Sequence, residues 1–421
     1  MSFEQIIAVF IFFLVMIAII TEKINRSLAA IGGGLLMIIF NILPLEIGIS
    51  HIDFNTIGIL IGMMLIVAVV KNSGLFEFIA IWTAKKAKGD PWRIMVAFII
   101  ITALLSAVLD NVTTVLLIGP MTIVITQILR LNPVPFLITQ IIASNIGGTS
   151  TLIGDPPNIM IGSAANLSFL DFVTNLGPII AIILVVMIIC FRFIFKNALV
   201  TDNSAKENIL HLDESKSIQD KPLLVKSIIV IIFVLFGFMF HNIIHIDSCV
   251  VALTGATVLL LIGKQDVEEI MSSIEWSTIT FFIGLFVIVG GLQEVGIINN
   301  IATLLINATE GHMIFTMLII LWLSAIISSF LDNIPFVATL IPLILTMQTQ
   351  GIDVMPLWWA TSLGACLGGN GTLIGASANV VLASVGQKHG YPITFKEYFK
   401  VGFPLMILSI IIATGYMLIK F

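Results

Sequence analysis

The sequence is poor in charged residues and in cysteine. Only 10% of its 421 residues are Asp, Glu, Lys or Arg, whereas a soluble protein carries about 25%. This scarcity of charge, together with a hydrophobic content of 58%, excludes a soluble globular protein and predicts an all-α polytopic membrane protein. The cysteines Cys190, Cys249 and Cys366 are scattered in apolar segments, so we expect neither a disulfide framework nor a cysteine metal site.

Several sequence features that are missing exclude particular classes of function. No basic cluster is large enough to follow a phosphate backbone, so nucleic acid is not an expected partner. No phosphate-binding Gly-x-x-x-x-Gly-Lys-Ser/Thr motif is present, so transport energy has to come from an ion gradient or a separate subunit. No histidine lies in a motif, which argues against an enzyme. Residues 1–20 lack a basic region and a cleavage site, and therefore predict a first membrane helix rather than a signal peptide.

Ten apolar stretches are long enough to span a bilayer. They lie at 4–20, 27–43, 55–71, 135–165, 176–196, 223–241, 249–263, 276–292, 356–386 and 401–420. Two further stretches, 94–129 and 314–347, are about 35 residues long with a polar centre. We expect each of these two to form a re-entrant hairpin of half-helices, because irregular backbone is tolerated at membrane depth when protein buries it. Two full spans per stretch remain an alternative.

The positions of the basic residues predict the orientation. With the N-terminus outside, 18 of the 19 Lys and Arg residues face the cytoplasm, and only Lys420 faces out. The sequence thus predicts a multi-pass protein of the plasma (inner) membrane. Residues 75–88 are typical of an interfacial amphipathic helix, and 197–221 of a cytoplasmic linker.

The chain contains an internal repeat. Asp110-Asn111 matches Asp332-Asn333 at an offset of 222 residues, and 151–154 matches 372–375 at an offset of 221, both with the sequence Thr-Leu-Ile-Gly. Each half, 1–196 and 222–421, holds five spans and a hairpin. Since five is odd, the second half enters the membrane in the opposite orientation, which predicts an inverted repeat of the kind found in secondary transporters.

The repeated carboxylates Asp110 and Asp332 are the first candidate site. A carboxylate in hydrocarbon is energetically unfavourable and indicates a functional group. Burial disfavours its charged form, so each group could exchange a proton for a cation. The structural alternative, that each Asp caps the second arm of its hairpin, is compatible with an ion-binding role. The predicted Na⁺ ligands are Asp110, Asn111, Asp332 and Asn333.

Two Gly-rich breaks, 145–158 and 367–379, form the second candidate site. Glycine and proline interrupt the helix there and free backbone N–H and C=O groups, which can hold ions in mid-membrane. Alternatively, the glycines only allow close helix packing. The full set of candidate binding residues is Asp110, Asn111, Thr113, Asn145, Gly148, Thr149, Thr151, Asp155, Asn158, Asp332, Asn333, Gly369, Asn370, Thr372, Ser377 and Asn379.

Two residues in the breaks depart from the symmetry. Asp155 has Ala376 as its counterpart, and it could either add charge to the site or cap the helix that follows. Cys366 stands opposite Asn145 and could be a packing residue or touch a thiophilic substrate. The sequence leaves both alternatives open.

At three motifs the chain resembles a known family. Residues 106–115 read Ser-Ala-Val-Leu-Asp-Asn-Val-Thr-Thr-Val, and 145–158 read Asn-Ile-Gly-Gly-Thr-Ser-Thr-Leu-Ile-Gly-Asp-Pro-Pro-Asn. Residues 368–380 read Gly-Gly-Asn-Gly-Thr-Leu-Ile-Gly-Ala-Ser-Ala-Asn-Val. These resemble the ArsB/NhaD permeases of the ion transporter superfamily, most closely the P protein branch. The resemblance implies a scaffold and a transport domain, a homodimer, and elevator-type alternating access.

The predicted function is secondary active ion transport. Asp-Asn in both hairpins looks like the sodium/proton antiporter branch, so we expect cation (Na⁺)/proton exchange, with H⁺ and Na⁺ as coupling ions and no organic cofactor. Proton-coupled efflux of arsenite or antimonite, and transport of a citrate-like organic anion, are the alternatives. An ion channel is the alternative from a different class, although channels usually present rings of like groups around a pore. The expected partners are a small ion, the lipid bilayer and a second copy of the chain.

Overall fold

The computed structural model describes the whole chain except Met1, Glu22, Glu310, Gly311 and the side chain of Asn242. The regular secondary structure of the described part is helical, and this part contains no strand. Within it, nine helices are long and apolar enough to cross a membrane. An integral multi-pass protein is therefore the class that the fold defines, as predicted from the scarcity of charge.

The first half of the chain contains ten α-helices. They are α1 (Phe3–Thr21), α2 (Arg26–Ile39), α3 (Leu45–Ser50), α4 (Phe54–Lys71), α5 (Leu75–Lys86), α6 (Pro91–Val108), α7 (Asn111–Ile128), α8 (Val134–Thr149), α9 (Pro156–Ala165) and α10 (Phe169–Phe195). After α11 (Asn203–Leu210), the second half contains α12 (Lys221–Ile244), α13 (Ser248–Gly263), α14 (Val267–Ser272), α15 (Trp276–Glu294), α16 (Ile297–Ala308), α17 (Met313–Phe330), α18 (Asn333–Thr349), α19 (Met355–Gly368), α20 (Ser377–Lys388) and α21 (Phe395–Lys420).

The duplication in the sequence recurs in the helix boundaries. The bounds of α3, α5 and α6 reappear 222 residues later as those of α14, α16 and α17. Helix α2 has 14 residues and ends four residues before the predicted span 27–43 does, whereas α13 has 16 residues and agrees with the predicted span 249–263. Two others, 135–165 and 356–386, are each interrupted as predicted, giving α8 with α9 and α19 with α20.

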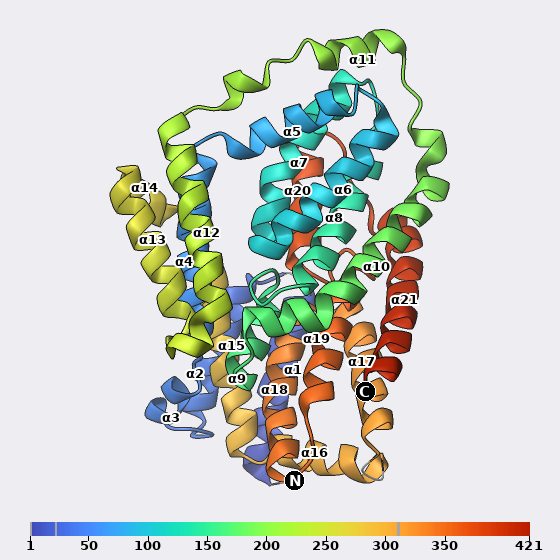
Figure 1. Cartoon of the computed structure of the whole chain (residues 1–421). Coiled ribbons are helices and arrows are strands. Elements are labelled where there is room, and N and C mark those ends of the chain that lie inside the picture. Colours follow the sequence, from blue (N-terminus) through green and yellow to red (C-terminus); the bar gives the residue numbers. More distant parts are fainter. Residues whose placement is uncertain (1, 22, 310–311) are drawn as a thin grey trace.

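Two helical hairpins approach each other from opposite ends of the molecule (Figure 1). Only Leu109 and Asp110 separate α6 from α7, and only Leu331 and Asp332 separate α17 from α18. The arms have 17 or 18 residues, about 27 Å at 1.5 Å per residue, which agrees with the predicted division of each stretch of about 35 residues near its middle. Helix α6 begins directly after Asp90, whose carboxylate accepts a bond from the Arg93 amide.

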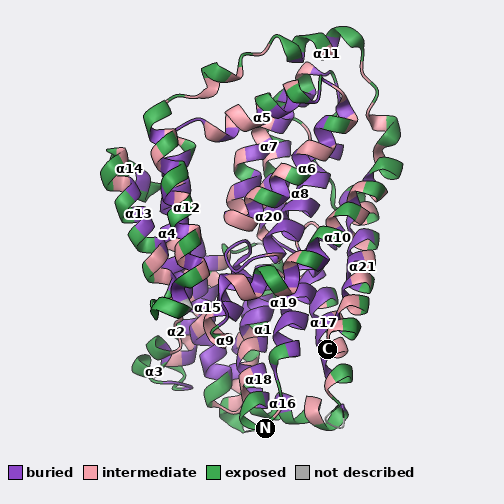
Figure 2. Ribbon diagram, viewed as in Figure 1, coloured by how far each residue is buried: buried purple, intermediate pink, exposed green. Residues whose placement is uncertain are grey.

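Helices α8 and α19 lie at the centre of the fold. Every residue of α8 is buried, and so is every residue of α19 after Met355. Helix α8 packs on α6 and α19 packs on α17, while α8 and α19 also touch each other. Figure 2 shows this buried centre enclosed by helices with exposed outer faces. Because α8 and α19 each end at a Gly-rich break, the breaks are placed deep inside the protein.

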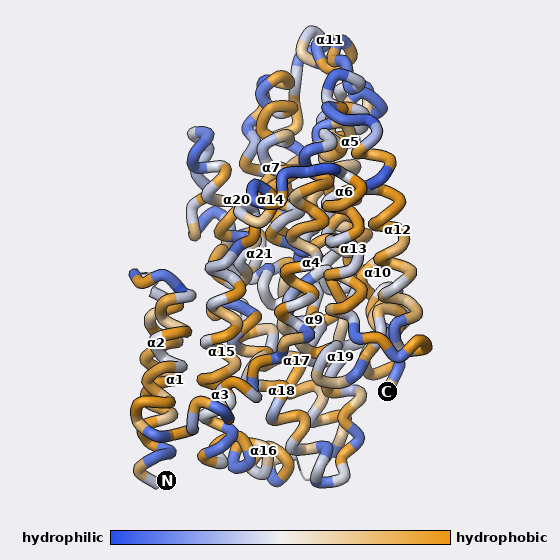
Figure 3. Tube along the Cα trace, turned by 90° about the vertical axis from the view of Figure 1, so that its left-hand side faces the viewer, coloured by the Kyte–Doolittle hydropathy of each residue, from blue (hydrophilic) through white to orange (hydrophobic). Residues whose placement is uncertain are grey.

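The outer helices present large apolar side chains to the surroundings. Phe10 of α1, Phe193 of α10 and Phe233 of α12 are at least two-thirds exposed, at 66%, 73% and 72%. Figure 3 shows long hydrophobic stretches along these helices. Apolar faces of this extent are typical of contact with lipid.

The segment 197–221, predicted to be a linker, is partly helical and contacts other helices. It contains α11, which packs on α5 and α7, and it runs over one end of the molecule (Figure 1). The Gln219 amide donates to the Ser73 carbonyl oxygen at 3.1 Å, and Lys85 forms an ion pair with Glu214. The linker is thus fastened to the helix predicted to be interfacial.

Candidate functional site

The first break is built by Asp155, Pro156 and the glycines around them. Helix α8 ends at Thr149, and α9 begins at Pro156 after Asp155, whose backbone is extended. Proline is favoured at the first position of a helix, where no amide bond is lost. A Cβ on Gly148 would lie 2.5 Å from the carbonyl oxygen of Gly154, so the chain can cross itself here only with glycine.

In the helix that follows each break, an asparagine donates hydrogen bonds to backbone carbonyl groups of that break. Asn158 donates through Nδ2 to three backbone carbonyls in 148–151, at 2.9 to 3.3 Å. Asn379 donates in the same way to two carbonyls in 369–372, at 2.7 and 2.9 Å. These bonds satisfy backbone groups that the interrupted helices leave without partners. The two asparagines therefore maintain the shape of the breaks.

Asn145 connects the two halves of the chain. Its Nδ2 donates to Oδ1 of Asn370 at 3.0 Å and to Oδ1 of Asn379 at 2.9 Å. Its Oδ1 accepts a bond from Nδ2 of Asn111, at the tip of the first hairpin, at 3.3 Å. All four side chains are buried. Asn145 thus fixes a hairpin tip of one half against the break of the other.

Cys366, the counterpart of Asn145, makes the reciprocal contact. Its thiol lies 3.6 Å from Oδ1 of Asn158, which also accepts a bond from the Ser362 hydroxyl at 2.6 Å. Cys366 is fully buried and lines neither of the cavities described next. The thiol is also a hydrogen-bond partner of Asp155, so Cys366 contacts a residue of the inner cavity without lining the cavity itself.

Five more of the predicted binding residues contact the backbone of the breaks and line neither cavity. The hydroxyls of Thr149 and Thr151 donate to the carbonyls of Asn145 and Ala107, each at 2.6 Å. The Thr372 hydroxyl donates to the Ser329 carbonyl. Gly148 and Gly369 pack against the backbone of Gly154 and Gly375.

A small inner cavity lies between the two hairpin tips. It has a volume of about 20 Å³ and is lined by Asp110 and Asn111 from one tip, by Asn333 from the other, and by Asp155. Arg26, Glu275, Thr278 and Ser377 complete its polar lining. A cavity of this size holds about one water-sized particle. Several oxygen groups therefore converge on a space that fits a single small ion.

The two carboxylates of the inner cavity are held differently. Asp110 caps α7, since it accepts bonds from the Thr113 amide at 2.8 Å and from the Thr113 hydroxyl. Asp155 makes no side-chain capping bond to α9. Instead it accepts from Nδ2 of Asn333 at 3.4 and 3.2 Å. The Asp155 side chain thus faces the cavity, although the residue occupies the N-cap position of α9.

Asp332 lines a second, outer cavity of about 270 Å³. It caps α18 through the Ile334 amide at 3.1 Å and accepts from the Ser377 hydroxyl at 2.7 Å. It also lies 3.5 Å from Nη1 of Arg26. The two aspartates that the repeat pairs in the sequence are therefore in different cavities, and the partner of Asp110 in the inner cavity is Asp155.

Arg26 and Glu275 line the inner cavity, although neither is among the candidate residues predicted from the sequence. Arg26 was expected in a cytoplasmic loop, but Nη2 donates to the Thr278 hydroxyl at 3.3 Å and the side chain reaches both cavities. Glu275 accepts from the Thr278 hydroxyl at 3.0 Å. A signal existed for Glu275, because the repeat matches it to Asp53, and both residues precede a threonine by three positions. The repeat contains no comparable signal for Arg26, because its counterpart is the uncharged Ser248.

The all-helical apolar fold and its buried polar centre define a multi-pass membrane transporter. The chain belongs to the citrate transporter family CitMHS, whose family model matches residues 16–364. It is 39% identical to a 46 kDa membrane protein of Mycobacterium leprae and 40% identical to an uncharacterized transporter of Mycobacterium tuberculosis, each over 99% of both chains.

More distant relatives agree with the fold. The chain is 34% identical to the human P protein, over 95% of this chain and 58% of that protein. Its fold is similar to that of the crystal structure of the YdaH transporter of Alcanivorax borkumensis, with a TM-score of 0.54, 12% identity and coverage of 99% and 97% of the two chains. The family and these relatives indicate a transporter rather than an enzyme.

Proposed function

We propose that this protein is a cation-coupled secondary active transporter whose coupling ion, Na⁺ or H⁺, binds in the inner cavity. The observation that carries the proposal is the convergence of Asp110, Asp155, Asn111 and Asn333 on a space of about 20 Å³. Carboxylate and amide oxygens are the ligands that hard cations prefer. A carboxylate can equally take a proton, so exchange of Na⁺ for H⁺ is the simplest reaction at this site.

The charge around the site supports a cation. Among the described residues that line the two cavities, the acidic groups are Asp110, Asp155, Asp332 and Glu275, and the basic group is Arg26. Four carboxyl groups against one guanidinium leave an excess of negative charge when they are ionised. In a medium of low dielectric constant, that excess attracts a cation and repels a free anion.

The proposed mechanism is alternating access by an elevator-type movement in a homodimer. Its basis is an inverted repeat, supported by the recurrence of helix bounds at an offset of 222 residues and by hairpins that enter from opposite ends (Figure 1). In repeats of this kind, substrate and ion sites lie where the two halves meet. We place the protein in the plasma (inner) membrane with its N-terminus outside.

Transport of a citrate-like organic anion is the second candidate. The observation that favours it is Arg26, since guanidinium groups recognise carboxylates, and the family model is described as a citrate transporter. The coupling cation would then offset part of the negative charge of the substrate. Both candidates require a cation in the inner cavity.

The test is transport in proteoliposomes that contain an internal pH dye. Na⁺, Li⁺, K⁺, chloride, arsenite and citrate are supplied in turn to the wild type and to the Asp110→Asn and Asp155→Asn variants. We expect both variants to lose the ion-dependent signal, while Asp353→Asn, at an exposed loop position, keeps it. Full activity of both variants on the confirmed substrate would refute the assignment of the ion site.

A further inference from the structure

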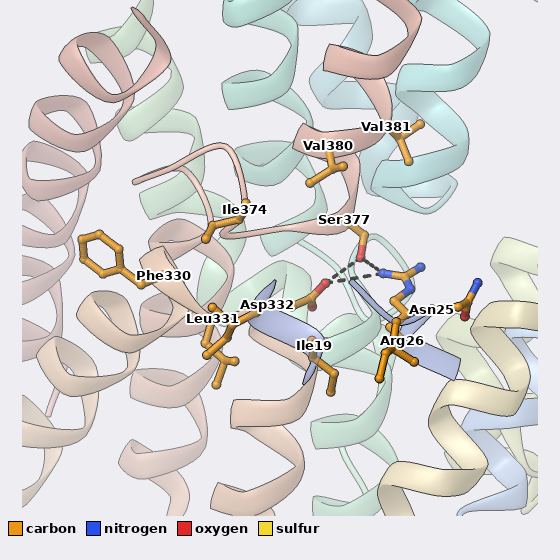
Figure 4. A pocket seen from close by; sticks show the side chains of 12 residues that line it. Ile19, Asn25, Arg26, Phe330, Leu331, Asp332, Ile374, Ser377, Val380 and Val381 are labelled. Atoms are coloured by element: carbon orange, nitrogen blue, oxygen red, sulfur yellow. Dashed lines mark hydrogen bonds and ion pairs between the residues drawn. The ribbon is translucent and has the colours of Figure 1, made fainter. Parts of the chain in front are cut away.

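A polar cavity of about 440 Å³ lies where the end of α12 and the start of α13 meet α4 and the end of α9. It shares no lining residue with the inner cavity or with the outer cavity that Figure 4 shows. None of its groups therefore takes part in the proposed ion site. The polar residues that line it are Asn55, Ser163, Asn166, His241, His245, Asp247 and Ser248.

His241 lines the polar cavity with a ring nitrogen that has no partner. The residue is 8% exposed, and among the described residues its Nε2 makes no hydrogen bond. The imidazole also contacts the backbone of Ile246. A neutral imidazole has one donor and one acceptor nitrogen, so Nε2 can accept a bond when the other nitrogen carries the proton. Since buried polar groups are normally hydrogen-bonded, a ligand in the cavity is the natural partner of Nε2.

The charges around His241 favour a cationic group. Asp247 lines the polar cavity, and Asp171 of α10 also lies within electrostatic reach of the imidazole. Asp171 already accepts two bonds from Ser168, each at 2.7 Å, whereas the Asp247 side chain makes no capping bond to α13. No Lys or Arg is among the described residues that line the cavity. The Asp247 carboxylate and Nε2 of His241 are therefore two acceptors available to an ammonium group.

An apolar groove of about 330 Å³ follows α12 and α13, which lie side by side (Figure 1). Its α13 wall extends from Val250 to Val258, about 12 Å at 1.5 Å per residue. One leaflet contributes about 15 Å of hydrocarbon to a bilayer, so the groove follows most of an acyl chain. Phe233 and Val250 in its walls are 72% and 47% exposed, which indicates that the groove opens toward the lipid.

Ile246 joins the two spaces, because it lines both the polar cavity and the apolar groove. It belongs to the turn between α12 and α13, at the end of a membrane-spanning helix. A ligand that occupies both spaces has a polar head at this end of the helix and an apolar chain along it. A phospholipid has that division, and its headgroup lies at the same level of the membrane.

We propose that the polar cavity and the apolar groove form one binding site for a phospholipid with a primary ammonium headgroup, phosphatidylethanolamine. The ammonium donates to the Asp247 carboxylate and to Nε2 of His241, and one acyl chain lies in the groove. A primary ammonium has three N–H donors. The trimethylammonium group of phosphatidylcholine has none, and the headgroup of phosphatidylglycerol has no cation. The site thus selects lipids by headgroup, and it is independent of the ion site proposed above.

The experiment is native mass spectrometry of the purified full-length protein, titrated in detergent with phosphatidylethanolamine, phosphatidylcholine and phosphatidylglycerol of the same acyl chains. We expect phosphatidylethanolamine to bind about fivefold more tightly than the other two lipids, as for one exposed ion pair. Asp247→Asn should abolish this preference and His241→Leu should reduce it. Asp353→Asn, at another exposed aspartate, is the matched control and keeps the preference.

A second pair of variants tests the groove. Thr254→Trp fills the groove and should weaken the binding of all three lipids. Thr257→Trp, at an exposed position of α13 that does not line the groove, should bind them like the wild type. Glycerophosphoethanolamine, which has the headgroup without acyl chains, should displace phosphatidylethanolamine only at much higher concentration.

Each part of the proposal can fail separately. Equal affinity for the three lipids, or an unchanged preference in both Asp247→Asn and His241→Leu, would refute the headgroup assignment. Lipid binding that is the same in Thr254→Trp and Thr257→Trp would refute the groove. Displacement by glycerophosphoethanolamine at the concentration at which the lipid itself binds would show that the acyl chain contributes nothing, and would refute the combined site.

Discussion

Asn333 donates through its side-chain amide to both carboxylate oxygens of Asp155, at 3.4 and 3.2 Å, across 178 residues of sequence. The two side chains are 2% and 1% exposed. Asn333 begins the second arm of one hairpin, and Asp155 ends the break of the other half. The bond thus ties a hairpin tip to the opposite break, and it fixes the carboxylate on the inner cavity.

Removal of this amide tests the role of Asp155 in ion binding. Asn333→Ala leaves the buried carboxylate without its amide donor, so that the Cys366 thiol remains as its side-chain hydrogen-bond partner. Because a buried carboxylate that loses a hydrogen-bond donor is less well held on the cavity, we expect the apparent affinity for the transported cation to fall about 10-fold, which corresponds to ~1.4 kcal/mol. Proteoliposome transport at varied cation concentration measures it. Asn307→Ala, on the exposed side of α16, is the control, and an unchanged affinity in Asn333→Ala would contradict the role given to the amide.

The close packing of hairpins on broken helices depends on glycine. A Cβ on Gly147 would lie 2.1 Å from the carbonyl oxygen of Ala103, and one on Gly368 would lie 2.6 Å from that of Ala325. We expect Gly147→Ala and Gly368→Ala each to destabilise the protein by about 1–3 kcal/mol or more, since backbone has to move. Thermal unfolding in detergent measures the loss. Gly415→Ala, where a Cβ meets nothing within 4 Å, should unfold like the wild type; equal stability of all three variants would show that the contact is not tight.

Local signals in the sequence predicted the hairpins and the breaks. Polar Leu-Asp-Asn tips inside apolar stretches, and glycine and proline inside spans, act on the residues next to them, so their effect can be read without tertiary information. The partners of these residues could not be predicted in this way. Asp155 meets Asn333 and Arg26 meets Asp332 across long sequence separations, and no periodicity records such contacts.

The repeat itself gave an incomplete view of the site. It presents Asp110 and Asp332 as equivalents, yet the halves differ at the positions that surround them. Arg26 has Ser248 as its counterpart, and Asp155 has Ala376. The first half therefore supplies both groups: Arg26 as a cation beside Asp332, and Asp155 as a second carboxylate beside Asp110. The asymmetry arises from these substitutions, and it needed the structure to show which side chains they face.

The three bonds of Asn145 predict a large effect of its removal on stability. Asn145→Ala breaks the contacts with Asn111, Asn370 and Asn379 and leaves buried polar groups without partners. Each such group is unfavourable by about 1–3 kcal/mol, so we expect a pronounced fall in the thermal unfolding temperature. Cys366→Ala removes thiol contacts at the equivalent position, among them the 3.6 Å contact with Asn158; because a thiol is a weak hydrogen-bonding group, it should lower the temperature much less. Equal shifts for the two variants would contradict the connecting role of Asn145.

The attachment of the linker 197–221 to α5 through Lys85 and Glu214 should weaken at low pH. A hydrogen bond from Lys85 holds the pKa of the Glu214 carboxyl below its ordinary value of 4.5. Since the pKa is lower in the folded state, the contribution of this pair to the attachment of the linker is present above that ordinary value and is lost as the pH falls below it. We expect cleavage of 197–221 by proteinase K to increase below about pH 4.5 in the wild type. Lys85→Gln should show the faster cleavage already at neutral pH, whereas Lys88→Gln, at an exposed position, should behave like the wild type. A Lys85→Gln variant whose linker is cleaved at the wild-type rate at every pH would mean that the backbone contacts, such as that of Gln219 with Ser73, hold the linker without the ion pair.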